Sequence, residues 1–255
     1  MNSISQEDKT YSIEYWVVRH GETQGNINKI IQGWMPGEIS DLGAEQAKLV
    51  GKRLQKVKFD HIYVSDLKRT VDTANYILSH SDHHLDSTTE SGVVNFNKEM
   101  RLREKSAGVY EGQPLGSTSH AAKELGLNPR EYKPEGGESW LDLNARLNSF
   151  LHETVEKHLK SLVKTRVDQN IKQDQNEEQK SYEDVHPRHS PKLLCVTHGG
   201  TITEILNILD QFQGDERPRD KVRNCSLFVF RAIYDRESDC VRWESVIEND
   251  TTHLH

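Results

Sequence analysis

Two short apolar runs, far apart in the chain, each lead into a histidine followed by glycine. The run 13–18, rich in aromatic and β-branched residues, precedes Arg-His-Gly at 19–21, and the run 193–197 precedes His-Gly-Gly at 198–200. Runs of this length and composition are typical of buried strands. Since open α/β sheets bind ligands at the carboxyl ends of their strands, the pattern predicts a sheet with two histidines at a ligand-binding edge.

Further helix-like and strand-like segments alternate along the chain. Apolar residues recur at helical spacing in the segments 41–57, 67–78, 139–162 and 202–209. The residues expected to cap the first three helices are Ser40 or Asp41, Ser65 or Asp66, and Glu138 or Ser139. Additional strands are expected at 61–64, 93–96, 225–232 and 241–247, the last two as an antiparallel pair at the sheet edge. The alternation predicts an α/β fold, with loops at 24–39 and 106–116.

The polar segments of the chain define its expected domain organisation. Residues 1–12 are predicted to be a flexible N-terminus without a signal or transit pattern, and residues 13–255 a single domain. The segment 165–191 is dominated by Gln, Asn, Asp, Glu and Lys. With so few apolar groups it cannot offset the entropy of ordering. We therefore expect it to be a mobile surface insertion without a catalytic role.

Charge and cysteine content exclude several classes of function. The net charge of −7 argues against a nucleic-acid-binding protein, which would carry a basic face, and no apolar run is long enough to cross a bilayer. The three cysteines, Cys195, Cys225 and Cys240, lack the spacing of metal ligands. Reduced thiols indicate a reducing compartment, so we expect a cytoplasmic protein. The sequence does not specify an oligomeric state.

Five short motifs occur in a fixed order. A single histidine after a strand would indicate little, because such a residue is more often part of a hydrogen-bonded loop. The motifs are Arg19-His20-Gly21-Glu22-Thr23 with Asn26, Gln32-Gly33, Ser65-Asp66-Leu67-Lys68-Arg69-Thr70, Leu102-Arg103-Glu104, and Thr197-His198-Gly199. Together they resemble the histidine phosphatase superfamily, also called phosphoglycerate-mutase-like, over about residues 14–230. The resemblance implies a three-layer sandwich, a mostly parallel sheet with helices on both faces.

The resemblance also implies a mechanism that needs no metal or other cofactor. His20 would be the nucleophile and would form a phosphohistidine, with its other ring nitrogen donating to a backbone carbonyl. Arg19 and Arg69 would grip phosphate oxygens bidentately. His198 would lie opposite His20 and stabilise charge that develops in the transition state.

Further residues of the motifs are expected to bind the substrate. Asn26 can donate an amide hydrogen bond, and glycine at position 199 lets a backbone N–H approach an anion closely. Gln32 and Gly33 are also expected to bind the substrate, because they form one of the five motifs.

The general acid is expected to be Glu104, which is followed by Gly108, Glu111 and Gly112 as in the phosphatase branch. The alternative role for Glu104 is a salt bridge to Arg101 or Arg103. Glu22 is the other carboxylate that competes for the role of general acid. Around Glu104, Arg101, Arg103 and Lys105 form an expected outer cationic cluster for a second phosphate.

Within the superfamily the chain most resembles the TIGAR-type fructose-2,6-bisphosphatases, in the runs 59–70, 101–112 and 134–138. It departs from many relatives at 34–40, where they carry Asp and then Pro-Leu-Thr. The resemblance implies removal of the 2-phosphate of fructose 2,6-bisphosphate. The alternatives are a broad small-molecule phosphatase, a cofactor-dependent phosphoglycerate mutase, a protein phosphatase, and a binding module that has lost activity.

Overall fold

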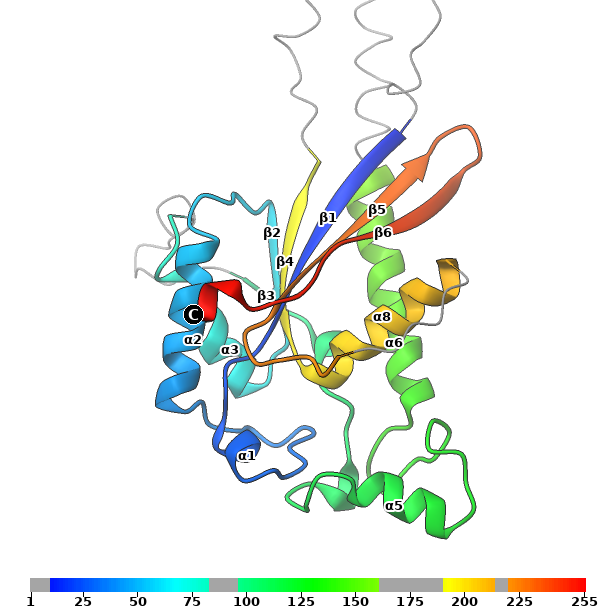
Figure 1. Ribbon diagram of the computed structural model, residues 1–255. Helices are drawn as coiled ribbons and strands as arrows, with labels where there is room; N and C mark the ends of the chain where they lie inside the picture. The colour runs from blue at the N-terminus through cyan, green and yellow to red at the C-terminus, as the bar shows by residue number, and fades with distance from the viewer. Residues whose placement is uncertain (1–9, 83–95, 161–189, 214–219) are drawn as a thin grey trace, which may run out of the picture.

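The computed structural model describes residues 10–82, 96–160, 190–213 and 220–255 (Figure 1). The centre of the fold is a six-stranded sheet with the strand order β3-β2-β4-β1-β5-β6. Its strands are β1 (Thr10–Arg19), β2 (His61–Val64), β3 (Asn97–Lys98), β4 (Lys192–Thr197), β5 (Leu227–Asp235) and β6 (Cys240–Asp250). Strands β1 to β4 run parallel to one another, whereas β5 and β6 pair antiparallel at one edge. The expected mostly parallel sheet with an antiparallel edge pair is confirmed.

Helices cover both faces of this sheet (Figure 1). On one face lie α2 (Asp41–Arg53) and α3 (Lys68–Leu78). On the other lie α6 (Trp140–Val155), which continues as the π-helical turn η4 (Glu156–Lys160), and α8 (Gly199–Gln213). The short helices α1 (Gln24–Ile27) and α5 (Ser117–Glu124) lie beyond the carboxyl ends of β1 and β4. The three-layer architecture is therefore as expected.

The alternation of buried side chains along β1 explains why helices cover both faces of the sheet. Ile13, Tyr15 and Val17 are buried in the cluster that includes α6 and α8, whereas Val18 is buried in the cluster that includes α2 and α3. Successive side chains of a strand point to opposite faces. A central strand that is apolar on both faces therefore requires a helical layer on each side.

Local capping accounts for the start of two helices. Ser40 precedes α2 and accepts a hydrogen bond from the Gly43 amide, and Ser139 forms a capping box with Asp142 at the start of α6. Both satisfy backbone donors that have no partner within the helix. These two caps are among the alternatives that the sequence predicted.

The cap expected for α3 is wrong. Leu67 occupies the N-cap position, and no side chain caps the helix. The two expected candidates have other partners: Ser65 Oγ bonds to Nε2 of His198, and Asp66 accepts two hydrogen bonds from Arg103. Tertiary contacts thus take both side chains away from the helix terminus.

Several expected boundaries differ from those observed. Strand β1 begins at Thr10, within the segment expected to be a flexible N-terminus. The third strand is β3 at 97–98 instead of 93–96, and most of the latter range lies outside the described residues, as does 165–189 of the expected insertion. Helix α1 lies within the expected loop 24–39, and α5 follows the expected loop 106–116. Within the described residues, no helix is long and apolar enough to cross a membrane.

Candidate active site

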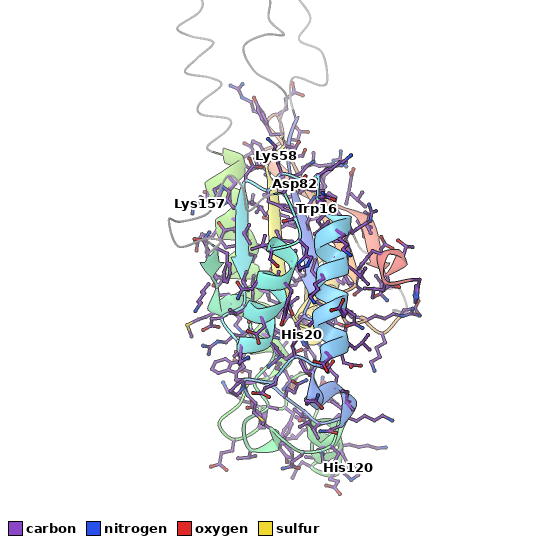
Figure 2. All side chains as sticks on the ribbon, turned by 90° about the vertical axis from the view of Figure 1, so that its left-hand side faces the viewer. Trp16, His20, Lys58, Asp82, His120 and Lys157 are labelled. Atoms are coloured by element: carbon purple, nitrogen blue, oxygen red, sulfur yellow. The ribbon has the colours of Figure 1, made fainter. Side chains whose placement is uncertain are left out.

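The two histidine motifs meet at the carboxyl ends of β1 and β4. These strands are adjacent and parallel, with Arg19 paired to Thr197, and the His20 amide donates to the Thr197 carbonyl over 2.9 Å. The rings of His20 and His198 lie 5.3 Å apart. Figure 2 shows His20 at the end of the strands that faces α5, where His120 is labelled. The predicted edge with two histidines is therefore present.

A cavity of about 300 Å³ opens at this edge. Its lining includes most of the residues expected to act on the substrate, namely Arg19, His20, Asn26, Gln32, Gly33, Arg69, Glu104 and Lys105. The rest of the lining is mainly apolar or small and comes from the loop after α1, from α5 and its neighbouring loops, and from the starts of α6 and α8; it includes Ile30, Ile31, Ala107, Leu115, Gly116, Thr118, Ser119, Pro129, Trp140 and Gly200. The lining thus combines polar and charged side chains with apolar and small ones.

His20 is held as a neutral imidazole with a defined tautomer. It is 3% exposed, and its Nδ1 lies 2.7 Å from the Gly21 carbonyl oxygen, which can only accept. Nδ1 therefore carries the proton, and Nε2 keeps its lone pair. Burial, followed by the charges of Arg19 and Arg69, holds the pKa of His20 well below its usual range. The ring is consequently neutral at neutral pH, with one proton on Nδ1.

Arg19 presents an unsatisfied donor at the site. Its Nη1 donates to the Val222 carbonyl over 2.8 Å, but its Nε is buried and has no hydrogen-bond partner among the described residues. Burial lowers the pKa of Arg19. Because Arg19 also lines the cavity, its guanidinium group places a positive charge beside His20.

Arg69, in the first turn of α3, is 1% exposed and has more protein partners. Nη1 donates to the Met35 carbonyl and Nη2 to the Gly33 carbonyl, each over 2.7 Å. Burial lowers the pKa of Arg69 to about 10, so the side chain stays charged at neutral pH. Arg69 therefore places a positive charge at the cavity and also fixes the loop that follows Gln32.

His198 lies behind Arg69 and is not among the residues that line the cavity. Its Nδ1 accepts from Arg69 Nε over 3.2 Å, so Nε2 carries the proton, which is directed toward Ser65 Oγ at 2.8 Å. Burial, then Arg69 and His20, holds the pKa of His198 well below its usual range. The structure brings this histidine to the site, but as a neutral partner of Arg69 instead of a direct partner of the substrate.

Glu104 is fixed at the amino end of α8. Its Oε2 accepts from the Gly200 amide and its Oε1 from the Lys105 amide, each over 2.9 Å. A Cβ at position 200 would lie 2.3 Å from Oε1, so only glycine permits this approach. The Glu104 carbonyl accepts from Trp34 Nε1 and Arg146 Nη2. Glu104 thus faces the cavity and forms no salt bridge with either neighbouring arginine.

Three other expected residues occupy supporting positions. Gln32 Oε1 accepts from the Thr23 hydroxyl over 2.9 Å. Gly199 begins α8 and does not line the cavity; a Cβ there would lie 3.1 Å from Arg19 Nε. Glu22 accepts from the Ser40 hydroxyl over 2.9 Å and so shapes the loop.

Two of the three members of the expected outer cluster lie away from the cavity and pair with carboxylates. Arg101 pairs with Glu99 and with Glu153, each at 2.7 Å. Arg103 forms two hydrogen bonds with Asp66 and lies 4.5 Å above the Trp34 ring. Neither lines the cavity. Carboxylates therefore neutralise both arginines: Glu99 lies two residues from Arg101, whereas Glu153 and Asp66 are distant in the sequence.

Lys105 is the member of that cluster that remains at the cavity. Its Nζ donates to the Glu138 carbonyl over 2.9 Å and lies 5.7 Å from the Trp140 ring centre. Partial burial lowers the pKa of Lys105.

Several contributions to the site carry no recognisable sequence signal. Trp34 and Asn224 each donate to the catalytic segments, Trp34 to the Glu104 carbonyl and Asn224 to the His20 carbonyl. Neither belongs to a motif, and both act on segments distant in the sequence. The part of the chain that the structure describes contains no group of three or more His, Cys, Asp or Glu side chains that could hold a metal ion.

Comparison with known proteins identifies related sequences. A sequence profile of the histidine phosphatase superfamily (branch 1) matches residues 15–165. Fructose-2,6-bisphosphatase TIGAR of Bos taurus is 41% identical over 135 residues, which cover 52% of this chain and 47% of the relative. Phosphoglycerate mutase-like protein 4 of Arabidopsis thaliana is 29% identical over 263 residues, covering 98% of this chain and 90% of the relative. The chain spans about half the length of the TIGAR relatives that it matches.

A comparison of folds gives the same architecture. The crystal structure of phosphoglycerate mutase from Bacillus anthracis str. Sterne superposes with a TM-score of 0.68 at 21% sequence identity, and the match covers 98% of each chain. At this identity the likeness establishes the fold alone.

Proposed function

Because the chain belongs to the histidine phosphatase superfamily, we propose that it is a metal-independent phosphatase that forms a phosphohistidine on His20. The observation that carries this proposal is the state of His20, a neutral imidazole whose Nδ1–H donates to Gly21. Its Nε2 is left with a lone pair, in a cavity that Arg19 and Glu104 also line. Nucleophile, cation and acid are thus present together.

In the first step, His20 Nε2 attacks the phosphorus of a phosphomonoester. The N–P bond forms as the P–O bond to the leaving group breaks, and the leaving oxygen takes the electron pair and a proton from Glu104. Arg19 and Arg69 balance the charge on the phosphoryl oxygens. These two guanidinium groups supply the positive charge that a metal ion supplies in other phosphatases.

In the second step, water attacks the phosphohistidine. The Glu104 carboxylate takes a proton from the water, the N–P bond breaks, and His20 is released as neutral imidazole together with inorganic phosphate. The low pKa of His20 supports this cycle, because the imidazole is a good leaving group and returns ready for another attack.

The candidate substrate is fructose 2,6-bisphosphate, with its 2-phosphate at His20. Similarity to the TIGAR enzymes supports this choice, although it extends over about half of their length. Lys105 lines the same cavity as Glu104 and can hold the second phosphate. Because Arg101 and Arg103 are neutralised elsewhere, this second site has one cation where the sequence suggested three.

A broader small-molecule phosphatase is the second candidate. The lining of the cavity includes Ile31, Leu115 and Trp140, which can pack against the apolar face of a sugar without a second phosphate. The mutase and protein-phosphatase alternatives keep the same chemistry at His20 and differ in what accepts or carries the phosphoryl group.

The mechanism is tested by trapping the intermediate. Wild-type protein mixed with phosphorus-labelled substrate and quenched without acid should carry an acid-labile, alkali-stable label on His20. Label on Ser, Thr or Asp would overturn the mechanism.

The substrate is tested by comparing kcat/KM for fructose 2,6-bisphosphate, 2,3-bisphosphoglycerate and a panel of monophosphates. We expect Lys105→Met to raise KM for the bisphosphates about tenfold more than for monophosphates, the equivalent of about 1.4 kcal/mol. Arg101→Met is the matched control and should leave this ratio unchanged. A monophosphate preferred tenfold or more by the wild type would replace the bisphosphatase assignment with the broader one.

A further inference from the structure

The turn between α8 and β5 clamps the loop that carries the nucleophile. The Cys225 amide donates to the Arg19 carbonyl over 3.1 Å, and the Arg19 amide donates to the Ser226 carbonyl over 3.3 Å. Asn224 reaches furthest into the site: its Nδ2 donates to the His20 carbonyl and to Asn26 Oδ1, each over 3.0 Å. One amide group thus bridges the nucleophile and a residue that lines the cavity.

Backbone groups fix the orientation of both amide side chains. The His20 carbonyl can only accept, so the atom of Asn224 beside it must be Nδ2. The Thr23 amide can only donate, over 3.2 Å, so the atom of Asn26 beside it must be Oδ1. Asn224 therefore gives its second hydrogen to the same Asn26 oxygen. The orientation of each amide side chain is therefore set by a backbone group that can only accept or can only donate a hydrogen bond.

This assignment determines what Asn26 offers to a ligand. With Oδ1 occupied by two donors, Nδ2 is the part of the amide that is left for the cavity, and it makes no hydrogen bond to another described residue. A half-turn of the amide would instead place an oxygen beside the ligand and repel an anion. The Thr23 amide alone would resist that half-turn with a single long hydrogen bond.

We propose that Asn224 is a positioning residue that locks the Asn26 amide with its N–H groups toward the phosphoryl oxygens. Asn224 itself does not touch the substrate. The assignment rests on the proposed phosphatase function, because it assumes that an anion occupies the cavity.

The shape of the turn does not depend on Asn224. Asn249 accepts from the Arg223 amide over 3.2 Å and donates to the Lys221 carbonyl over 3.1 Å, and the Ser226 hydroxyl donates to the Arg223 carbonyl over 2.7 Å. Asn249 holds the same turn without contacting the nucleophile loop. It therefore provides a matched control, as Asn249→Asp.

The experiment measures how tightly inorganic phosphate inhibits hydrolysis of p-nitrophenyl phosphate. Loss of a hydrogen bond to a charged group should weaken phosphate binding about tenfold in Asn224→Ala and also in Asn26→Ala. The double variant should bind phosphate within about twofold of Asn26→Ala, since residues that act through one another are not additive. Asn249→Asp should match the wild type. Asn224→Asp keeps the side-chain volume but cannot donate a hydrogen bond, so it should lose at least as much phosphate affinity as Asn224→Ala. It replaces the alanine variant in this test if that variant does not fold.

Each outcome bears on a different part of the assignment. Wild-type protein that does not bind phosphate would reject the proposed phosphate site and with it this role. If the wild type binds phosphate, unchanged binding in both Asn224 variants would overturn only the role of Asn224. Fully additive losses of phosphate affinity in the double variant, or an equal loss in Asn249→Asp, would show that Asn224 only supports the turn.

Discussion

Two pairs of histidine rings lie close together in the described part of the chain, at opposite ends of the sheet, and they differ in what surrounds them. His20 and His198, with rings 5.3 Å apart, lie at the carboxyl ends of β1 and β4. His61, the first residue of β2, and His158, in η4, have rings 4.1 Å apart. Figure 2 shows Lys157, a neighbour of His158, in the upper part of the molecule, and His20 well below it, on the side of His120.

Burial makes every one of these histidines harder to protonate, so a neutral imidazole alone does not define an active site. Burial and the neighbouring His61 lower the pKa of His158 to about 4, and burial also lowers the pKa of His61. His158 Nε2 is bonded to the Tyr63 hydroxyl over 2.9 Å, and neither member of this pair lines the catalytic cavity. What distinguishes the His20 pair is the cavity beside it, which Arg19, Arg69 and Glu104 also line.

The sharpest test of this comparison replaces one histidine of each pair by a neutral residue of similar size. His20→Gln should lower turnover by at least about 10⁴-fold, as expected for loss of a nucleophile. His158→Gln should leave turnover within about twofold, because it contacts no residue of the cavity. Steady-state hydrolysis of a sugar phosphate measures both. A comparable loss in the two variants would show that the second pair also serves catalysis.

The next effect concerns Glu104, the carboxyl group that lines the cavity beside His20. Glu104→Gln should slow hydrolysis of a sugar phosphate by about 10²–10⁴-fold, the usual contribution of a general acid. It should slow hydrolysis of p-nitrophenyl phosphate far less, because p-nitrophenolate leaves without a proton. Equal losses on both substrates would indicate that Glu104 binds substrate and does not donate a proton.

The second pair should affect stability instead of activity. The pKa of His158 is about 4 in the folded protein and about 6.5 in the unfolded chain. The unfolded state therefore binds more protons between these values, and stability should fall as the pH drops from about 6.5 toward 4, by at most about 1.4 kcal/mol per pH unit for this residue.

Urea unfolding of wild type and of His158→Gln across that pH range measures this contribution. The variant should show a shallower dependence of unfolding free energy on pH. An unchanged slope would mean that His158 takes up no proton on unfolding.

The smallest expected effect is that of metal removal. Arg19 and Arg69 already place positive charge at His20, so exhaustive chelation should leave turnover unchanged. Activity before and after dialysis against a chelator, with and without added Mg²⁺ or Zn²⁺, measures this. A strict requirement for either ion would contradict the proposed role of the two guanidinium groups.

Much of the fold could be predicted because it depends on local patterns. The strand at 61–64 is observed at the expected bounds, and Ser40 and Ser139 cap the helices that follow them. Strand composition and capping act between residues a few positions apart, so a single sequence contains the information. The order of the motifs likewise indicated which residues would gather, since parallel strands bring their carboxyl ends to one edge.

The sequence by itself determined the superfamily, the layered fold and the residues that meet at the catalytic edge. Only the tertiary structure decided the partner of each of these side chains. Arg103 pairs with Asp66, His198 supports Arg69, and Asn224 orients Asn26. These contacts join positions separated by 37, 129 and 198 residues. A charged or polar side chain can satisfy its hydrogen bonds with any complementary group that the fold brings near, so its partner follows from three-dimensional packing and not from the neighbouring sequence.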